Sequence, residues 1–131
     1  MLRQIPLFIL FRRIHNETLP PKKSIRNLIV CLAVNLLPIP FTDLSSSKVR
    51  PAVVVGHGSW PGDLLVVPVT SQLQNADLII GQWAEAGLNV PSGIKGQICT
   101  VEVRLVRKVV GKITATDRGA LDALLRKWLE L

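Results

Sequence analysis

Two apolar runs divided by a glycine-rich turn constrain this chain more than any other feature. Residues 51–55 (PAVVV) and 64–69 (LLVVPV) are rich in valine, and GHG at 56–58 and PGD at 61–63 lie between them. Branched residues favour strands, whereas glycine, proline and aspartate favour the turns that join antiparallel neighbours. The sequence therefore predicts a β-hairpin and, with it, a fold that is mainly β.

Further strands are expected on both sides of this hairpin. Residues 97–104 alternate between polar and apolar side chains, a pattern typical of a half-buried strand. A bulge or kink is expected at Gly111, because glycine inside a strand often marks one. The remaining expected strands cover residues 30–39, 78–80 and 105–114, and turns are expected at residues 87–91 and 93–96.

The C-terminal segment has the period of a helix rather than of a strand. Its apolar side chains fall at helical spacing: Leu121, Leu124, Leu125, Trp128 and Leu129. Thr116 is expected to cap this helix, and Asp117 suits the positive end of its dipole. We expect the helix to close one side of a small, strongly bent sheet or barrel, so the fold class is mainly β (α+β) with a C-terminal helix.

The chain is expected to contain one domain, residues 31–131, after a basic extension at residues 1–30. The formal net charge is +7, but residues 1–27 hold six basic residues and one acidic residue, and so account for about +5 of it. From Val34 onward, ten basic residues oppose eight acidic ones. A nucleic-acid site in the domain must therefore depend on the local placement of charge.

Several classes of protein are disfavoured. The longest apolar run, residues 28–41, has 14 residues and is interrupted by Asn35 and two prolines, whereas a membrane-spanning helix needs about 20. The two histidines are far apart and no Cys-x-x-Cys is present, so we expect no metal site and no cofactor. Cys31 and Cys99 lie in apolar runs and are expected to be reduced and buried. We expect a cytoplasmic protein that does not enter a membrane.

One pair of polar residues interrupts the apolar strands at a place that hairpin geometry makes informative. Arg50 stands at the start of the first run, and Thr70 stands at the end of the second. If the two runs pair antiparallel, the start of one strand lies beside the end of the other. Arg50 and Thr70 are therefore expected to be neighbours in space, although 20 positions separate them.

This pair has the chemistry of a phosphate site. A guanidinium binds two oxygens in one plane, and a hydroxyl donates a further hydrogen bond. The same groups can stabilise the charge that builds on a phosphoryl group when RNA is cut by its own 2′-hydroxyl, a route that needs no metal. The alternative from residue type alone is that Arg50 is solvated and that Thr70 and Ser71 are ordinary turn residues.

Three segments carry a resemblance to a known family. Residues 40–55 (PFTDLSSSKVRPAVVV), 62–72 (GDLLVVPVTSQ) and 87–93 (GLNVPSG) closely resemble the PemK/MazF toxins of bacterial toxin–antitoxin systems, and the match runs from about residue 33 to the C-terminus. The resemblance implies an SH3-like β-barrel, a homodimer and a small antitoxin partner. It also implies metal-independent, sequence-specific cleavage of single-stranded RNA, such as mRNA, that leaves a 2′,3′-cyclic phosphate.

The resemblance also implies roles for individual residues. The catalytic arginine and threonine of the family fall on Arg50 and Thr70. The substrate-binding residues that it implies, in part on the polar loop 42–48, are Thr42, Ser46, Lys48, Ser71, Gln72, Lys95 and Arg104. For Lys95 and Arg104 the alternative of a solvated surface charge remains open.

The chain also departs from the family pattern. Leu32-Ala33-Val34 stands where relatives have Gly-Asp or Gly-Glu, and Gly96-Gln97 stands where some relatives have an acidic residue. The group that accepts the proton from the 2′-hydroxyl is therefore open. His57 lies in the turn at the hairpin end away from Arg50, so we interpret it as a loop residue.

Two other functions remain open at this point. A non-enzymatic toxin of the related CcdB type, which poisons DNA gyrase, would depend mainly on its C-terminal helix, especially Trp128. A degenerate and inactive relative would result if the altered first strand disrupted the site. Both alternatives predict that RNA stays intact, whereas an endoribonuclease cuts it and loses this activity when Arg50 is replaced.

Overall fold

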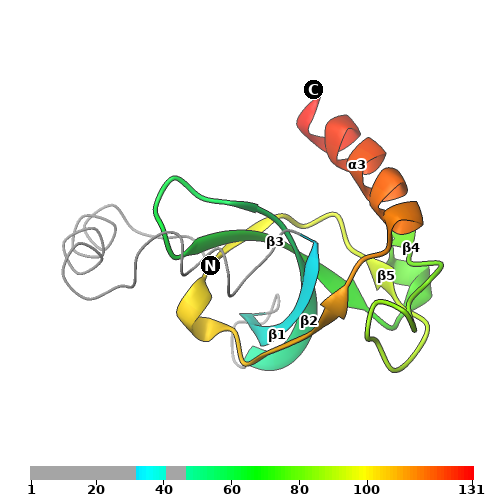
Figure 1. Ribbon diagram of the computed structural model, residues 1–131. Coiled ribbons are helices and arrows are strands. Elements are labelled where there is room, and N and C mark those ends of the chain that lie inside the picture. The colour runs from blue at the N-terminus through cyan, green and yellow to red at the C-terminus, as the bar shows by residue number, and fades with distance from the viewer. Residues whose placement is uncertain (1–31, 41–46) are drawn as a thin grey trace.

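The computed structural model describes residues 32–40 and 47–131, so predictions about residues 1–31 and 41–46 lie outside the described part of the chain. Within the described ranges the chain forms seven strands, two short 3₁₀ helices and one α-helix (Figure 1). In order they are β1 (Ala33–Pro40), β2 (Ser47–His57), β3 (Asp63–Thr70), η1 (Leu73–Asn75), β4 (Leu78–Ile79), β5 (Gly93–Ile94), β6 (Cys99–Glu102), η2 (Val103–Leu105), β7 (Lys108–Lys112) and α3 (Ala115–Leu129). The predicted fold class is confirmed. None of the described helices is both long and apolar enough to span a bilayer.

The predicted hairpin is present as β2 and β3. The two strands pair antiparallel, with Val53 opposite Val67 and Ala52 opposite Pro68. The register shifts between Val54 and Gly56, which is a bulge near the turn. The hairpin thus sets a fixed register for the strand ends that lie away from the turn.

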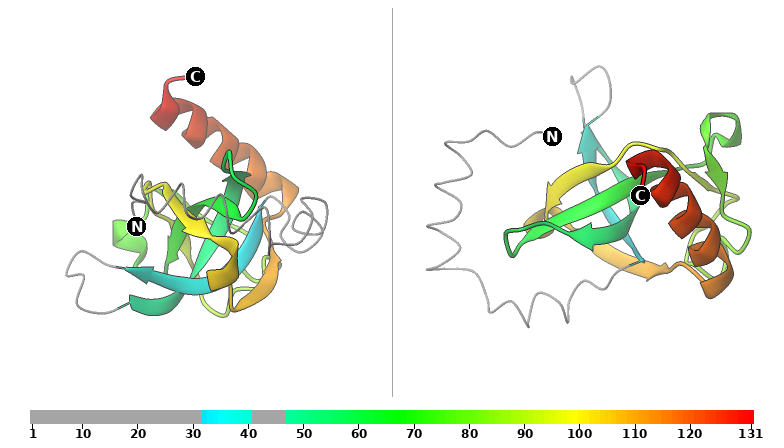
Figure 2. Two further views of the ribbon diagram at one scale, coloured as in Figure 1. Left: turned by 90° about the vertical axis from the view of Figure 1, so that its left-hand side faces the viewer. Right: turned by 90° about the horizontal axis from the view of Figure 1, so that it is seen from above.

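The sheet bends because a short link joins two strands on opposite sides of it. Its order is β4-β5-β3-β2-β1-β7, and β6 pairs with β3. Only residues 103–107 separate β6, bound to β3, from β7, bound to β1, so the layer must curve until its edges approach each other (Figure 2). In the described part of the chain no ladder joins β6 to β7, and the barrel therefore remains open.

The two faces of the bent sheet hold separate apolar clusters. The inner cluster, enclosed by the bend, contains Leu37, Ile39, Ala52, Val54, Leu64, Val66 and Val101. The outer cluster lies on the other face, where α3 and residues 80–88 cover it (Figure 1). It contains Leu32, Val34, Val53, Val67, Val69, Ile80, Ala86, Ile94, Ile113 and Leu121. Because both faces of the hairpin are covered, its strands are uninterrupted valine runs rather than alternating ones.

Three local predictions were wrong. Residues 93–96 were expected to form a turn, but Gly93–Ile94 is a strand that pairs with both β3 and β4, too short to show a sequence period. The strand expected over residues 97–104 ends at Glu102, because the chain turns there toward β1. The cap of α3 is Thr114 rather than Thr116, and its Oγ1 accepts a hydrogen bond from the backbone N of Asp117 at 3.5 Å.

Two other local predictions can be compared with the structure. The pairing of β1 with β7 skips Val110, so a bulge lies directly beside Gly111, as expected. The thiol of Cys99 is free but half-buried, whereas the sequence predicted a buried one. Its Sγ donates a hydrogen bond to the carbonyl of Gln97 at 3.4 Å.

Candidate active site

Arg50 and Thr70 lie at the end of the hairpin away from its turn. The last paired residues there are Ala52 and Pro68, and continuing this register by two residues sets Arg50 opposite Thr70. Residues directly opposite each other in an antiparallel pair project from the same face, with Cβ atoms about 5 Å apart. Ala52 belongs to the inner cluster, so both side chains extend the inner face beyond its apolar part. The structure thus places both residues at the same end of the hairpin, two positions beyond its last paired residues.

Two lysines project from the same face. Lys48 precedes Arg50 by two positions on β2, and alternate residues of a strand point to the same side. The backbone N of Lys95 donates to the carbonyl of Pro68 at 3.0 Å, which continues the β3–β5 register and sets Lys95 on the side of Thr70. Two strand ends, those of β2 and β5, therefore place three positive charges on the same face as the Thr70 hydroxyl, an arrangement that attracts phosphate.

The Thr70 hydroxyl is held by the residues that follow it. The backbone N of Gln72 donates to Thr70 Oγ1 at 3.0 Å. The side chain of Gln72 in turn accepts a hydrogen bond from Asn75 Nδ2 at 2.8 Å, which fixes the start of η1. A hydroxyl that accepts through its oxygen still has its own proton to donate. The backbone of Gln72 thus holds the Thr70 oxygen and leaves the hydroxyl proton available for a hydrogen bond to another group.

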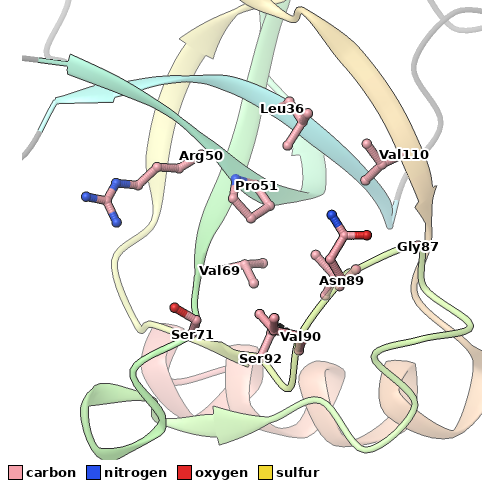
Figure 3. A pocket seen from close by; sticks show the side chains of 11 residues that line it. Leu36, Arg50, Pro51, Val69, Ser71, Gly87, Asn89, Val90, Ser92 and Val110 are labelled. Carbon is pink, nitrogen blue, oxygen red and sulfur yellow. Dashed lines mark hydrogen bonds between the residues drawn. The ribbon is translucent and has the colours of Figure 1, made fainter.

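Ser71 points to the other face of the sheet. Neighbouring residues of an extended chain alternate, so Ser71 follows Val69 to the outer face. There it lines a pocket between the strand ends and residues 87–92 (Figure 3). Figure 3 shows the guanidinium of Arg50 extending away from Pro51 and Val69, which face this pocket. Arg50 itself also lines the pocket, so the strand ends at Arg50 and Thr70, here called the rim, border both the inner face and the pocket.

Arg104 and His57 lie at the far end of the hairpin. Glu102, two positions before Arg104, is opposite Asp63 at the start of β3, whereas Thr70 ends that strand. At about 3.3 Å per residue, this is a separation of roughly 23 Å. Arg104 forms an ion pair with Glu102, and this hydrogen bond, with the attraction between the charges, raises the pKa of Arg104 above its ordinary value. The structure does not bring Arg104 to the rim.

A carboxylate from another segment lies beside the loop that precedes β6. Gly96 packs against Trp128, because a Cβ at Gly96 would come within 2.7 Å of Cζ2 of that ring. Asp77 Oδ2 accepts a hydrogen bond from the backbone N of Gly96 at 2.6 Å. Sequence reasoning assigned Asp77 no role, because the contact joins residues 19 positions apart.

Sequence reasoning also missed the residues of the pocket, among them Asn89 and Ser92. The segment 87–93 was noticed only for its resemblance, and its spacing carries no signal of a pocket. Two predicted site residues, Thr42 and Ser46, lie outside the described residues.

Comparison with known proteins identifies the family. No curated protein matches the chain by sequence. A family profile described as "PemK-like, MazF-like toxin of type II toxin-antitoxin system" matches residues 33–129, which is most of the chain. The chain belongs to this toxin family. The resemblance carried by the motifs is thereby confirmed, and membership of such a system implies that the toxin has an antitoxin partner.

A solved structure has the same fold as this toxin. The Mycobacterium tuberculosis toxin MazF-mt6 superposes with a TM-score of 0.59 at 19% sequence identity. The match covers 76% of the present chain and 97% of the other. This likeness concerns the fold, and it agrees with the open, bent sheet and the C-terminal helix of the toxin.

Proposed function

We propose that the toxin is an endoribonuclease that cuts single-stranded RNA at short sequences, without a metal ion, and leaves a 2′,3′-cyclic phosphate. The observation that carries this proposal is that Arg50 and Thr70 end the β2–β3 hairpin on the same side, each two positions beyond its last pair, Ala52 and Pro68. Family membership supports it, because the resemblance to PemK/MazF toxins implies the same activity.

Arg50 and Thr70 suit the charge that develops in this reaction. The ribose 2′ oxygen forms a bond to phosphorus while the bond from phosphorus to the 5′ oxygen breaks. The 2′-hydroxyl loses a proton and the 5′ oxygen gains one, so the reaction is balanced. Negative charge meanwhile grows on the phosphoryl oxygens, where a guanidinium fork and a donated hydroxyl proton stabilise it. One such donor is typically worth about 10²–10³ in rate.

The other residues of the proposed site bind or position the RNA. Lys48 and Lys95 attract the phosphates on either side of the cut, because they share the face of the catalytic pair. Gln72 orients Thr70, and Ser71 contacts the neighbouring nucleotide on the outer face. Roles for Thr42 and Ser46 on the loop remain predictions. We leave Arg104 out of the site because it lies at the far end of the hairpin.

We also propose that the toxin acts as a homodimer in the cytoplasm and that a small antitoxin covers the rim. An antitoxin bound there would exclude RNA, because both would occupy the same strand ends. Sedimentation of the purified toxin, alone and with its antitoxin, measures both assemblies. A toxin that cuts RNA equally well when its antitoxin is bound would contradict this part of the proposal.

The gyrase-poison alternative is not favoured. It would depend on Trp128, which is half-buried, packs against the outer cluster and lies over Gly96. A side chain used in this way to hold α3 on the sheet has little surface left for a partner.

The proposal is tested by incubating the purified toxin with a long single-stranded RNA in EDTA. We expect discrete fragments that end in 2′,3′-cyclic phosphates. Arg50→Ala should lower the rate by at least about 10²-fold, and Thr70→Val, which keeps the shape but removes the donor, by about tenfold or more. Thr100→Val on β6 is the matched control, because Thr100 lies opposite Leu65 in the other half of β3, and it should cut at the normal rate.

Circular dichroism and thermal melting show whether each variant is folded. Intact RNA with the folded wild-type toxin would overturn the proposal. Cleavage by Arg50→Ala at the wild-type rate would overturn the assignment of the catalytic pair.

A further inference from the structure

The pocket on the outer face adjoins the rim and has a volume of about 260 Å³. It lies between the ends of β1, β2 and β3 and residues 87–92, and Figure 3 shows the side chains that surround it. Leu36, Pro51, Val69 and Val110 form apolar walls. The polar side chains of the pocket are Arg50, Ser71, Asn89 and Ser92. The pocket is thus large enough for a small flat ligand, and it combines apolar walls with a hydrogen-bonding amide.

The rim and the pocket are two sides of the same strand ends. Pro51 follows Arg50 on β2, and Ser71 follows Thr70 at the end of β3. Pro51 and Ser71 both line the pocket, and so does Arg50 itself, so the pocket adjoins the catalytic pair directly. A single-stranded RNA with a phosphate at the rim therefore has an adjacent nucleotide at the mouth of the pocket.

The polar groups of the pocket match the edge of a nucleobase. Figure 3 shows the exposed Asn89 with its amide directed toward the space between Pro51 and Val110. An amide offers one acceptor and two donors, the combination that pairs with neighbouring donor and acceptor atoms of a base. Ser92 Oγ donates to the carbonyl of Val90 at 2.8 Å, so toward a ligand its oxygen acts as an acceptor.

We propose that this pocket binds one unpaired nucleobase of RNA, next to the scissile phosphate, and that Asn89 selects the base. The identity of the substrate as RNA rests on the proposed function. An aliphatic side chain of a protein partner would fit the apolar walls, but it has no donor or acceptor to pair with the Asn89 amide. A base satisfies both the walls and the amide, as in single-stranded RNA recognition generally.

A contact between two backbones fixes the wall of the pocket before any ligand binds. Gly87 has φ of 92°, and a Cβ there would lie 2.1 Å from the carbonyl oxygen of Val110. A Cβ on Gly111 would lie 2.0 Å from the carbonyl oxygen of Ala86. Only glycine allows the segment to approach β7 this closely. The backbone that carries Asn89 is therefore seated on the sheet.

The start of the same segment is tied to the helix. The carboxylate of Asp117, in the first turn of α3, accepts hydrogen bonds from the backbone N atoms of Gly81 at 3.0 Å and Gln82 at 2.9 Å. Thr114, the cap of α3, donates to the side chain of Gln82. The segment that carries Asn89 is thus held both at its start and at Gly87. The pocket therefore loses little conformational freedom when a base binds, which favours selectivity.

Binding without cleavage tests the proposal directly. The probes are four 2′-O-methyl RNA hexamers, each of one base, in which the blocked 2′ oxygen prevents cutting. Backbone amide NMR of the full-length toxin should show residues 89–92 responding to one hexamer at lower concentration than to the other three. Asn89→Leu should weaken the binding of the preferred hexamer about tenfold and remove the preference for it. Gln74→Leu also replaces an exposed amide side chain by leucine, but at a site outside the pocket, and should leave the preference unchanged.

The outcomes separate the pocket from the proposed function. The proposal fails if the hexamers shift resonances near Thr70 but none near Asn89. It also fails if N-acetyl-leucinamide, a probe for an aliphatic side chain, shifts residues 89–92 and no hexamer does. Loss of the proposed function would instead appear as uncut RNA in the EDTA assay, and the hexamer result would stand independently of it.

Cleavage of a randomised RNA gives a second readout. Aspartate only accepts hydrogen bonds, so Asn89→Asp should shift the cleavage sequence at one position beside the cut toward the bases with an amino group, cytosine, adenine or guanine, and away from uracil. Other positions of the cleavage sequence should stay as they are. An unchanged sequence profile in both Asn89→Asp and Asn89→Leu would overturn the assignment of Asn89.

Discussion

The two ends of β3 carry similar residue types but differ in what surrounds them. At the turn end, Arg104 forms an ion pair with Glu102 two positions away, and 70% of its side-chain surface is exposed. At the rim, Arg50 is half-buried and shares the end of the hairpin with Thr70, with Lys48 on the same face. Because Glu102 already pairs with the positive charge of Arg104, this arginine contributes little to the binding of a phosphate. Neighbours set by the strand register, rather than residue type, distinguish a candidate site from a surface ion pair.

The largest difference between the rim and the turn end should appear when the arginine at each end is replaced by lysine, which keeps the positive charge but lacks the planar guanidinium. Lysine cannot bind two phosphoryl oxygens in one plane. We therefore expect Arg50→Lys to lower the RNA cleavage rate by about 10²-fold. Arg104→Lys, the same change at the turn end, should keep the rate within about twofold. Single-turnover cleavage rates of the two variants measure this directly.

Equal losses in the two variants would remove the distinction between the ends. A loss in Arg104→Lys alone would move the site to the turn. A denaturation curve for each variant accompanies the rates, so that a change in the amount of folded protein is not mistaken for a change in chemistry.

Hairpin geometry explains why the centre of the site could be predicted from the sequence. The turn residues between 56 and 63 made an antiparallel pair the expected arrangement, and the observed pairing leaves Arg50 and Thr70 at the same end of the hairpin. The valine runs gave the hairpin, and the leucine spacing gave α3. In each case the signal is local, or extends over a single turn of known type.

The other parts of the site depend on contacts that sequence patterns do not encode. Lys95 reaches the face of Thr70 through β5, a strand of two residues that was read as a turn. Asn89 reaches the pocket because Gly87 and Gly111 let two distant backbones touch. Arg104 was expected near phosphate, but the chain turns away at Glu102. Short strands and glycine contacts leave no periodic signal.

The second-largest effect, on stability, is expected where the segment that forms the pocket wall packs on β7. Gly111→Ala adds a Cβ that would lie 2.0 Å from the carbonyl oxygen of Ala86, so the backbones must separate. We expect the free energy of unfolding to fall by about 2 kcal/mol, a typical cost of overpacking. Gly119→Ala is the matched control, because no atom lies within 4 Å of a Cβ at this helical position.

The control should behave in the opposite sense. Alanine is the better helix former, so Gly119→Ala should raise the free energy of unfolding by about 0.5–1 kcal/mol. Urea denaturation of both variants measures the two values. If Gly111→Ala were as stable as the wild-type toxin, the close contact of the two backbones would not be what holds the pocket wall.

The smallest effect concerns the charges around the rim rather than the catalytic pair itself. Each phosphate neutralised on a single strand releases counterions and contributes about 0.7 to the slope of log affinity against log salt. Lys48 is exposed on the face of Arg50, so Lys48→Ala should reduce that slope by about 0.7 and weaken RNA binding only a few-fold. Lys127→Ala should change neither value, because Lys127 lies in the last turn of α3 and lines neither the rim nor the pocket. Binding of a 2′-O-methyl RNA hexamer at several salt concentrations gives both slopes, and equal slopes for Lys48→Ala and the wild-type toxin would mean that RNA does not pass over the inner face beside Arg50.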